Sequence, residues 1–285
     1  MKITRIGVIG AGIMGSGIAQ VCAQAGYEVI IRDIEERFVE KGLQAIRDSL
    51  DRMVEKEKLV REEAEAVMGR IKGTIKLEDI AQSELIIEAV IEKKEPKRTL
   101  YQELESLCDP KVIIASNTSS LSITELASFS NRPNKFVGLH FFNPVPVMEL
   151  VEIIRGLETS DETFNIVKEV VDNIGKVGIE INDSPGFAVN RILVPMLNEA
   201  AFALMEGIAS REDIDNGMKL GCNHPIGPLA LMDMIGLETI LSVMESFYSE
   251  FGDPKYRPCP LLKQKVRAGH LGRKTGKGFY EYDIK

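Results

Sequence analysis

The chain has 285 residues, 44% hydrophobic and 27% charged, as expected for a globular protein long enough for two domains. A formal net charge of −8 argues against nucleic acid as the main partner, and no apolar run is long enough to cross a bilayer. Residues 1–15 lack the layout of a signal peptide. The cysteines form no C-x-x-C pair, so we expect reduced thiols, a cytoplasmic location and no metal site.

The N-terminal segment carries a glycine motif between an apolar strand and a helix. Residues 6–9 predict a buried strand, and the glycines that follow have the spacing G-x-G-x-x-G. The first glycine permits a tight turn, the second lets the backbone approach a pyrophosphate, and the third lets the helix over 13–25 pack against the strand. The start of that helix presents unpaired N–H groups to an anion. Contacts with a dinucleotide are therefore expected at Gly10, Gly12, Ile13, Met14 and Gly15.

A second apolar run ends at Asp33, about 20 residues beyond the glycines. An acidic residue at this distance can bind the adenosine ribose hydroxyls of a dinucleotide and repels the 2′-phosphate of NADP. A glycine turn that served only for packing would leave Asp33 unexplained. Arg32 and Arg37 lie close enough in sequence to bind a phosphate, so NADP stays open as the less favoured cofactor. The order strand, helix, strand and acid predicts NAD binding.

Apolar runs alternate with helical patterns as far as Pro185. The helical patterns include a long charged excursion over 35–72. Such alternation predicts an α/β fold with a mostly parallel, doubly wound sheet of the Rossmann type. Further strands are expected over 111–116, 136–140, 150–154 and 177–181, and 83–92 is expected to hold a strand and the loop at its end. Helices are expected over 95–107 and 160–174.

The pattern changes after Pro185, and no further strand is expected. The main helical candidates cover 187–206, 211–220 and 228–250. We therefore expect a Rossmann-type domain over 1–185 and a smaller all-α C-terminal domain over 186–285. Because the second domain is small and apolar, we expect it to bury one face against another copy, giving a homodimer or a higher homo-oligomer.

His140 is the sharpest catalytic candidate. It ends an apolar strand, and polar residues beyond the carboxyl ends of parallel strands face the ligand crevice. An imidazole can give or take a proton near neutral pH, and Glu152 in the next strand could fix its tautomer and stabilise its cation. The alternative is a hydrogen-bonded histidine that only ends a strand. Other polar candidates at this edge are Glu92, Asn117, Ser119 and Asn143.

Longer motifs run along nearly the whole chain. They cover residues 10–19, 88–92 with Lys97, 116–120, 138–145, 151–154, 183–191, 227–237 and 276–280. Together they resemble the L-3-hydroxyacyl-CoA dehydrogenase family, and among its members the short enzymes that act on 3-hydroxybutyryl-CoA. The resemblance implies an oxidoreductase that interconverts (S)-3-hydroxybutyryl-CoA and acetoacetyl-CoA with NAD(H).

The same resemblance implies roles for individual residues. His140 would be the general acid and base, Glu152 would pair with it, and Ser119 and Asn190 would hydrogen-bond the substrate's oxygen atoms. Asn190 could instead be a simple helix-end amide, and Lys97 a solvated helix charge. The implied cofactor contacts are Asp33, Glu92, Lys97, Asn117, Ser119 and Asn143, and the implied coenzyme A contacts are Ser49 and Lys56.

Two other functions stay open at this point. A dehydrogenase of a free hydroxy acid or sugar acid would keep the fold and the histidine, although the basic residues around Lys56 argue mildly against it. A non-catalytic NAD-binding protein would keep only the glycine motif. A binding module has no need of a proton-transfer pair, so the set Ser119, His140, Glu152 and Asn190 argues against it.

Overall fold

The computed structural model describes residues 1–283, which divide into two compact units, one over Met1–Ser184 and one that begins at Pro185. Each unit has an apolar core of its own. The first is an α/β unit built on one sheet and the second consists of helices, which confirms the predicted fold class. No helix within residues 1–283 is long and apolar enough to cross a membrane.

One eight-stranded sheet forms the centre of the first unit, in the order β3-β2-β1-β4-β5-β6-β7-β8. Pairing is parallel from β3 to β6, the strand order of a Rossmann-type sheet, whereas β7 runs antiparallel to β6 and parallel to β8. The strands are β1 (Arg5–Ile9), β2 (Glu28–Arg32), β3 (Ile71–Thr74), β4 (Leu85–Glu88), β5 (Ile113–Ser116), β6 (Phe136–Phe141), β7 (Leu150–Arg155) and β8 (Val177–Asn182).

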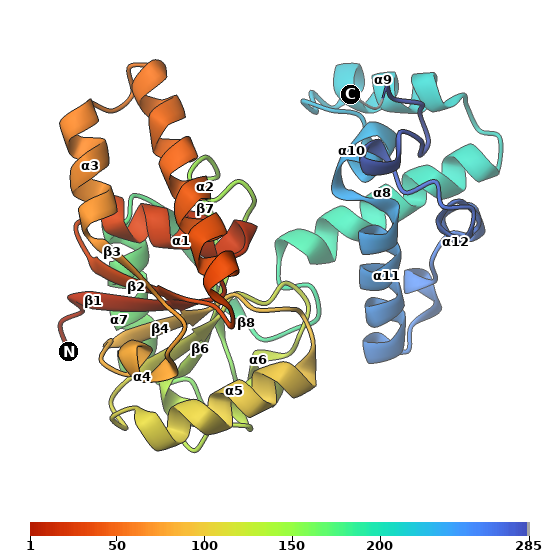
Figure 1. The fold of residues 1–285 in the computed structure, drawn as a ribbon. Coiled ribbons are helices and arrows are strands. Elements are labelled where there is room, and N and C mark those ends of the chain that lie inside the picture. The colour runs from red at the N-terminus through yellow and green to blue at the C-terminus, as the bar shows by residue number, and fades with distance from the viewer. Residues whose placement is uncertain (284–285) are drawn as a thin grey trace. The chain divides into compact units, whose positions relative to one another are not determined.

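Helices cover both faces of this sheet (Figure 1). On one face α1 (Ile13–Gln24), α2 (Glu36–Glu55), α3 (Arg61–Gly69) and α7 (Asp161–Asn173) share a core with the sheet. Figure 1 shows α5 (Lys94–Leu107) on the side of the sheet opposite to α1, where α4 (Leu77–Ile80) and α6 (Ile123–Ala127) also lie. Ser160 caps α7, because its Oγ accepts a hydrogen bond from the Thr163 amide at 3.2 Å.

The predicted helical excursion is a pair of packed helices, α2 and α3, that projects beyond the sheet (Figure 1). Gly42 lets α2 approach the glycine motif closely, since a Cβ there would lie 2.7 Å from the Ala11 carbonyl oxygen. The prediction that helix continues to residue 72 is wrong, because Ile71–Thr74 pairs with β2 as an edge strand. The short helices α4 and α6 were also not predicted.

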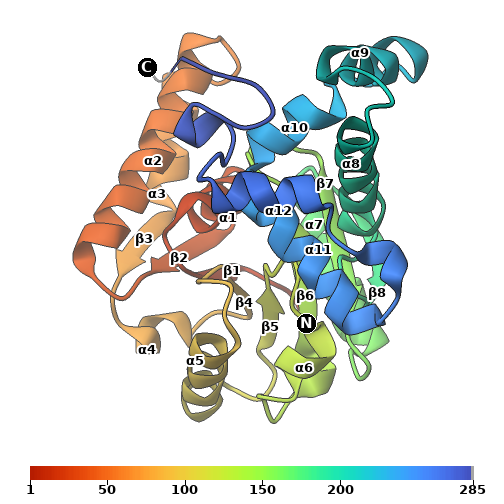
Figure 2. The same cartoon turned by 90° about the vertical axis from the view of Figure 1, so that its right-hand side faces the viewer.

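The second unit packs α8 (Val189–Met205), α9 (Arg211–Gly221), α10 (Pro228–Ile235), α11 (Leu237–Phe251) and α12 (Pro260–Arg267) around one core (Figure 2). The single helix predicted over 228–250 is wrong, because Gly236 adopts φ +106° and separates α10 from α11. The helix α12 was also not predicted. The tail is tied to α10, where the Asp233 carboxylate accepts hydrogen bonds from the Phe279 and Tyr280 amides at 2.8 Å each.

The glycine motif provides a stability test with a matched control. A Cβ at Gly15 would overlap the carbonyl oxygen of Gly10, which is backbone and cannot turn away, whereas a Cβ at Gly12 meets no atom within 4 Å. Gly15→Ala should therefore lower the free energy of unfolding by at least about 3 kcal/mol, and Gly12→Ala by less than about 1 kcal/mol. Urea denaturation measures both, and equal stability of the two variants would contradict this packing.

Candidate functional site

The glycine motif forms a tight turn between β1 and α1. Gly10 has φ +104°, and a Cβ there would lie 2.5 Å from the carbonyl oxygen of Ala89. Gly12 is the N-cap of α1 and no side chain caps that end, so the first amides of the helix point into the open space around Gly12. Ile13 at the first turn is 78% exposed. A close backbone and an uncapped helix start fit the pyrophosphate of a dinucleotide.

Asp33 lies beside this turn although 22 residues separate it from Ala11. Its Oδ2 accepts a hydrogen bond from the Ala11 amide at 2.7 Å, and its Oδ1 accepts one from the Ile34 amide at 2.7 Å. The carboxylate is half-buried at the end of β2. It therefore stands where the ribose of a dinucleotide bound at the glycine turn would lie.

Arg32 and Arg37, the two arginines that could have bound the 2′-phosphate of NADP, both have partners within the protein. Arg32 Nε donates to the Ile75 carbonyl oxygen at 3.3 Å. Arg37 forms an ion pair with Glu35 at 2.9 Å, and its guanidinium carbon lies 4.7 Å from the centroid of the Phe38 ring. Both guanidinium groups have partners within the protein, and the Asp33 carboxylate beside the glycine turn would repel a 2′-phosphate bound there. This arrangement favours NAD.

His140 and Glu152 form a buried pair across two strands. They are directly opposite each other in the antiparallel register of β6 and β7, which places both side chains on the same face of the sheet. His140 Nδ1 lies 2.7 Å from Glu152 Oε2. A carboxylate can only accept a hydrogen bond, so Nδ1 carries the proton in this contact and the ring is held in one orientation. The Phe142 ring packs against the imidazole, with centroids 4.5 Å apart.

A second buried cluster lies where β4 ends. The fully buried Glu88 carboxylate accepts two hydrogen bonds from Lys97 Nζ, at 2.6 and 2.8 Å. Tyr101 and Ser116 hydroxyls donate to the same carboxylate at 2.5 and 2.8 Å. The Lys97 side chain is only 1% exposed, so the alternative that it is a solvated helix charge is wrong. A fully buried charge pair needs this degree of hydrogen bonding to persist.

Glu92 connects this cluster to the loop after β5. Its carboxylate lies 3.4 Å from Lys97 Nζ and accepts hydrogen bonds from Thr118 Oγ1 at 2.5 Å and from the amides of Ser119 and Ser120 at 2.8 and 3.2 Å. Burial would raise the pKa of Glu92, but the Lys97 charge and these donors outweigh it and the pKa lies below its usual value. Glu92 is therefore ionised at neutral pH.

The other predicted residues of the first unit lie on separate elements. Asn117 Oδ1 accepts a hydrogen bond from the Phe141 amide at 3.0 Å, which joins the ends of β5 and β6. Asn143 is exposed in the loop after β6. Ser49 lies on α2 and Lys56 is the C-cap of that helix, one heptad further along the same face. Asn190 belongs to the second unit, where it is half-buried in the first turn of α8.

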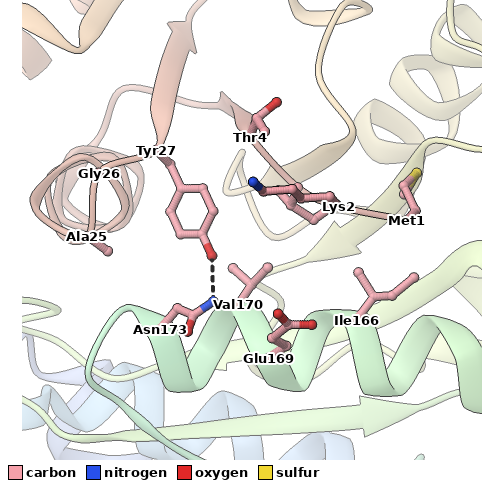
Figure 3. A pocket seen from close by; sticks show the side chains of 11 residues that line it. Met1, Lys2, Thr4, Ala25, Gly26, Tyr27, Ile166, Glu169, Val170 and Asn173 are labelled. Atoms are coloured by element: carbon pink, nitrogen blue, oxygen red, sulfur yellow. Dashed lines mark hydrogen bonds between the residues drawn. The ribbon is translucent and has the colours of Figure 1, made fainter.

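A pocket of about 600 Å³ opens at the amino-terminal ends of the strands, away from the glycine turn (Figure 3). Residues at the start of β1, the end of α1 and one side of α7 line it, and Asn173 Nδ2 donates to the Tyr27 hydroxyl at 3.2 Å. Ligands of parallel α/β sheets bind beyond the carboxyl ends of the strands, whereas this pocket lies at their amino ends. It is therefore separate from the glycine turn and the histidine pair.

Glu88 is the residue that sequence reasoning passed over. It appears in the sequence only as the first letter of the segment Glu-Ala-Val-Ile-Glu over 88–92. A charged residue that ends an otherwise apolar strand is rarely buried without a partner. That signal, together with Lys97 nine positions later, could have indicated a buried ion pair. Within residues 1–283, no group of three or more His, Cys, Asp or Glu residues is placed to hold a metal ion.

Two family models match nearly the whole chain. The NAD-binding domain of 3-hydroxyacyl-CoA dehydrogenase matches residues 5–184, and the C-terminal domain of 3-hydroxyacyl-CoA dehydrogenase matches residues 186–282. The two matches meet at the division between the two compact units.

Individual relatives are similar over their full length. A 3-hydroxybutyryl-CoA dehydrogenase of Bradyrhizobium diazoefficiens is 50% identical over 98% of this chain and 96% of its own. One of Clostridioides difficile is 47% identical over 98% of this chain and 99% of its own. The crystal structure of (S)-3-hydroxybutyryl-CoA dehydrogenase PaaH1 from Ralstonia eutropha is 52% identical with a TM-score of 0.98, covering 99% of this chain and all of that one.

The buried ion pair predicts a large asymmetry between two lysines of α5. Lys97→Met leaves the Glu88 carboxylate buried beside no cation, so the free energy of unfolding should fall by about 3–5 kcal/mol. Lys94 forms an ion pair with Glu125 at 2.6 Å, but both side chains are largely in solvent, so Lys94→Met should cost no more than about 1 kcal/mol. Urea denaturation at pH 7 measures the difference. Equal losses in the two variants would contradict the account of the cluster.

Proposed function

The chain belongs to the 3-hydroxyacyl-CoA dehydrogenase family, and from this premise we propose that it interconverts (S)-3-hydroxybutyryl-CoA and acetoacetyl-CoA with NAD(H). The observation that carries the proposal is the buried His140–Glu152 pair at the same sheet edge as the glycine turn. Full-length relatives at about half identity that are named 3-hydroxybutyryl-CoA dehydrogenases support the choice of substrate.

In this proposal His140 exchanges a proton with the 3-oxygen of the substrate. Glu152 holds Nδ1, so Nε2 is the nitrogen that we assign to the transfer. In the oxidative direction Nε2 removes the hydroxyl proton, and the Glu152 carboxylate stabilises the imidazolium that results. In the reductive direction the imidazolium returns a proton to the developing alkoxide. The bound nicotinamide supplies or accepts the hydride at C3.

The remaining site residues bind and orient in this proposal. The glycine turn and Asp33 hold the dinucleotide, because the backbone around Gly12 is open and Asp33 is fixed beside it. Ser119 and Asn190 hydrogen-bond the substrate, and Ser49 and Lys56 contact coenzyme A. No ion pair within the described residues engages Lys56, which suits a lysine that binds an anionic ligand. Further cofactor contacts are assigned to Ile13, Met14, Glu92, Asn117, Ser119 and Asn143. The direct contact expected of Lys97 is not retained, because its side chain is 1% exposed and held by Glu88 and Glu92.

Two features support the proposed function over the alternatives. A non-catalytic NAD-binding protein would need neither a buried histidine nor a carboxylate to hold it. A dehydrogenase of a free hydroxy acid would need no cation at the end of α2, where Lys56 is exposed. Both features favour an enzyme that takes a coenzyme A thioester.

All four cysteines are free thiols, which supports a reducing, cytoplasmic location as part of the proposal.

A homodimer through the helical unit is part of the same proposal. A cavity of about 320 Å³ lies between α8 and α9, and most of its lining residues are apolar, with Glu199 and Asp213 as the exceptions. Ile192 on α8 and Leu220 on α9 are strongly exposed. These apolar residues are candidates for a contact with a second copy of the chain.

His140→Gln should lower turnover about 10³-fold, because the amide cannot exchange a proton. The binding of NADH should change little, since the glycine turn and Asp33 follow β1 and β2, whereas His140 lies on β6. The measurements are oxidation of NADH by acetoacetyl-CoA and NADH binding by fluorescence titration. A loss of turnover of threefold or less corresponds to a change of about 0.7 kcal/mol in the activation free energy, and it would show that His140 takes no part in the mechanism.

The proposed assembly is tested by sedimentation velocity. At micromolar concentration the chain should sediment as a dimer or larger, and Met218→Glu in the apolar cavity should shift the distribution toward the monomer. The matched control is Lys219→Glu, one position along α9 and outside that cavity. A monomer for the parent protein would contradict the interface.

A further inference from the structure

Glu88 lies at a junction of hydrogen bonds from three elements. It ends β4, and its carboxylate receives Lys97 and Tyr101 from α5 and Ser116 from the end of β5. The Val90 amide donates to Glu88 Oε1 at 2.8 Å, so the same carboxylate also binds the loop that follows its own strand. Glu88 is fully buried. A carboxylate with this many donors has both oxygens fixed.

The first loop fixed by Glu88 is the one that packs against the glycine turn. This loop begins at Ala89, whose carbonyl oxygen is so close to Gly10 that only a glycine fits there. The hydrogen bond from Val90 to Glu88 holds the backbone just beyond that contact. A shift of the Glu88 carboxylate would therefore move the backbone of residues 89–90, which packs against the glycine turn.

The second loop is reached through Lys97 and Glu92. Lys97 Nζ lies between the two carboxylates, closer to Glu88 (2.6 Å) than to Glu92 (3.4 Å). Glu92 in turn accepts the amides of Ser119 and Ser120. The position of Ser119 thus depends on Glu92, and the position of Glu92 depends on how strongly Lys97 is held by Glu88.

The negative charge of Glu88 is what this arrangement needs. A glutamine in its place would keep the size of the side chain but would leave Lys97 with Glu92 as its nearest anion. In a buried setting an ammonium moves toward the remaining carboxylate, because an unpaired buried charge is strongly disfavoured. Glu92 would then be drawn toward Lys97 and away from the Ser119 and Ser120 amides.

We propose that Glu88 is a positioning residue, which acts through Lys97 and Glu92 to hold Ser119 where the substrate's oxygen binds. The assignment of Ser119 to the substrate rests on the proposed function, whereas the link from Glu88 to the Ser119 amide rests on the contacts alone. Glu88 touches neither substrate nor cofactor in this proposal.

The test compares Glu88→Gln with Tyr101→Phe. Tyr101→Phe removes a hydrogen bond to the same buried carboxylate, but it leaves the charges of Glu88, Lys97 and Glu92 in place. The first readout is amide hydrogen exchange at Ser119 and Ser120, followed by mass spectrometry on peptides that cover 113–121. The second is the split between kcat and KM for acetoacetyl-CoA, with NADH saturating.

Glu88→Gln should speed exchange at the Ser119 and Ser120 amides about tenfold, while Tyr101→Phe leaves them as in the parent protein. It should also lower kcat/KM about 10²-fold, as for other small misplacements of a substrate contact. If the parent enzyme does not turn over acetoacetyl-CoA, the proposed function fails, and the exchange data still decide the role of Glu88. Exchange at Ser119 and Ser120 that is equal in Glu88→Gln and the parent overturns the proposal.

A double variant covers the case in which Glu88→Gln does not fold. Glu88→Gln with Lys97→Met replaces the buried ion pair by neutral groups, a change that proteins often tolerate. Without the ammonium of Lys97 nothing draws Glu92 away from the loop, so the Ser119 and Ser120 amides should exchange as slowly as in the parent protein. Exchange about tenfold faster than in the parent protein in this folded variant overturns the proposal.

Discussion

Parallel pairing of the strands from β2 to β6 is the constraint on which the rest of the site depends. Parallel strands end at the same edge, so the loops that follow them start at one level whatever their separation in sequence. The glycine turn, Asp33, the loop after β4 and the loop after β5 all begin at this level, and His140 lies two residues beyond it on β6. The row of paired residues that sets this level is Arg32, Ile9, Glu88, Ser116 and Gly138.

Two buried pairs of ionisable side chains lie at the carboxyl ends of these strands, and we propose different roles for them. The His140–Glu152 pair joins β6 to β7 and holds the imidazole in one orientation. The Glu88–Lys97 pair joins β4 to α5 and, through Glu92, reaches the backbone of the Ser119 loop. Each buried anion has a partner at hydrogen-bond distance, so neither cluster carries the cost of an isolated buried charge. We propose that the first pair exchanges a proton with the substrate and that the second holds the loops around it.

Much of this arrangement follows from the sequence, because apolar runs, glycine spacing and acid placement are local signals. The strand that precedes Asp33 and the strands that carry His140 and Glu152 were predicted within two residues of their observed ends. The edge strand β3 was missed because Ile-Lys-Gly-Thr has neither an apolar run nor clear alternation. The break between α10 and α11 depends on the positive φ of Gly236, and a single glycine in a helical pattern does not by itself predict the end of a helix. The burial of Lys97 arises from packing between α5 and β4, and the sequence signals it only weakly, through the charged Glu88 that ends an apolar run.

The most direct test of the account is the oxidation of NADH by acetoacetyl-CoA, run beside free acetoacetate and beside NADPH. The proposal requires rapid turnover with the thioester and NADH, little with the free acid, and a strong preference over NADPH because Asp33 stands where a 2′-phosphate would bind. Tight NADH binding without turnover of acetoacetyl-CoA would contradict the assigned reaction. Equal rates with NADPH would contradict the reading of Asp33, Arg32 and Arg37.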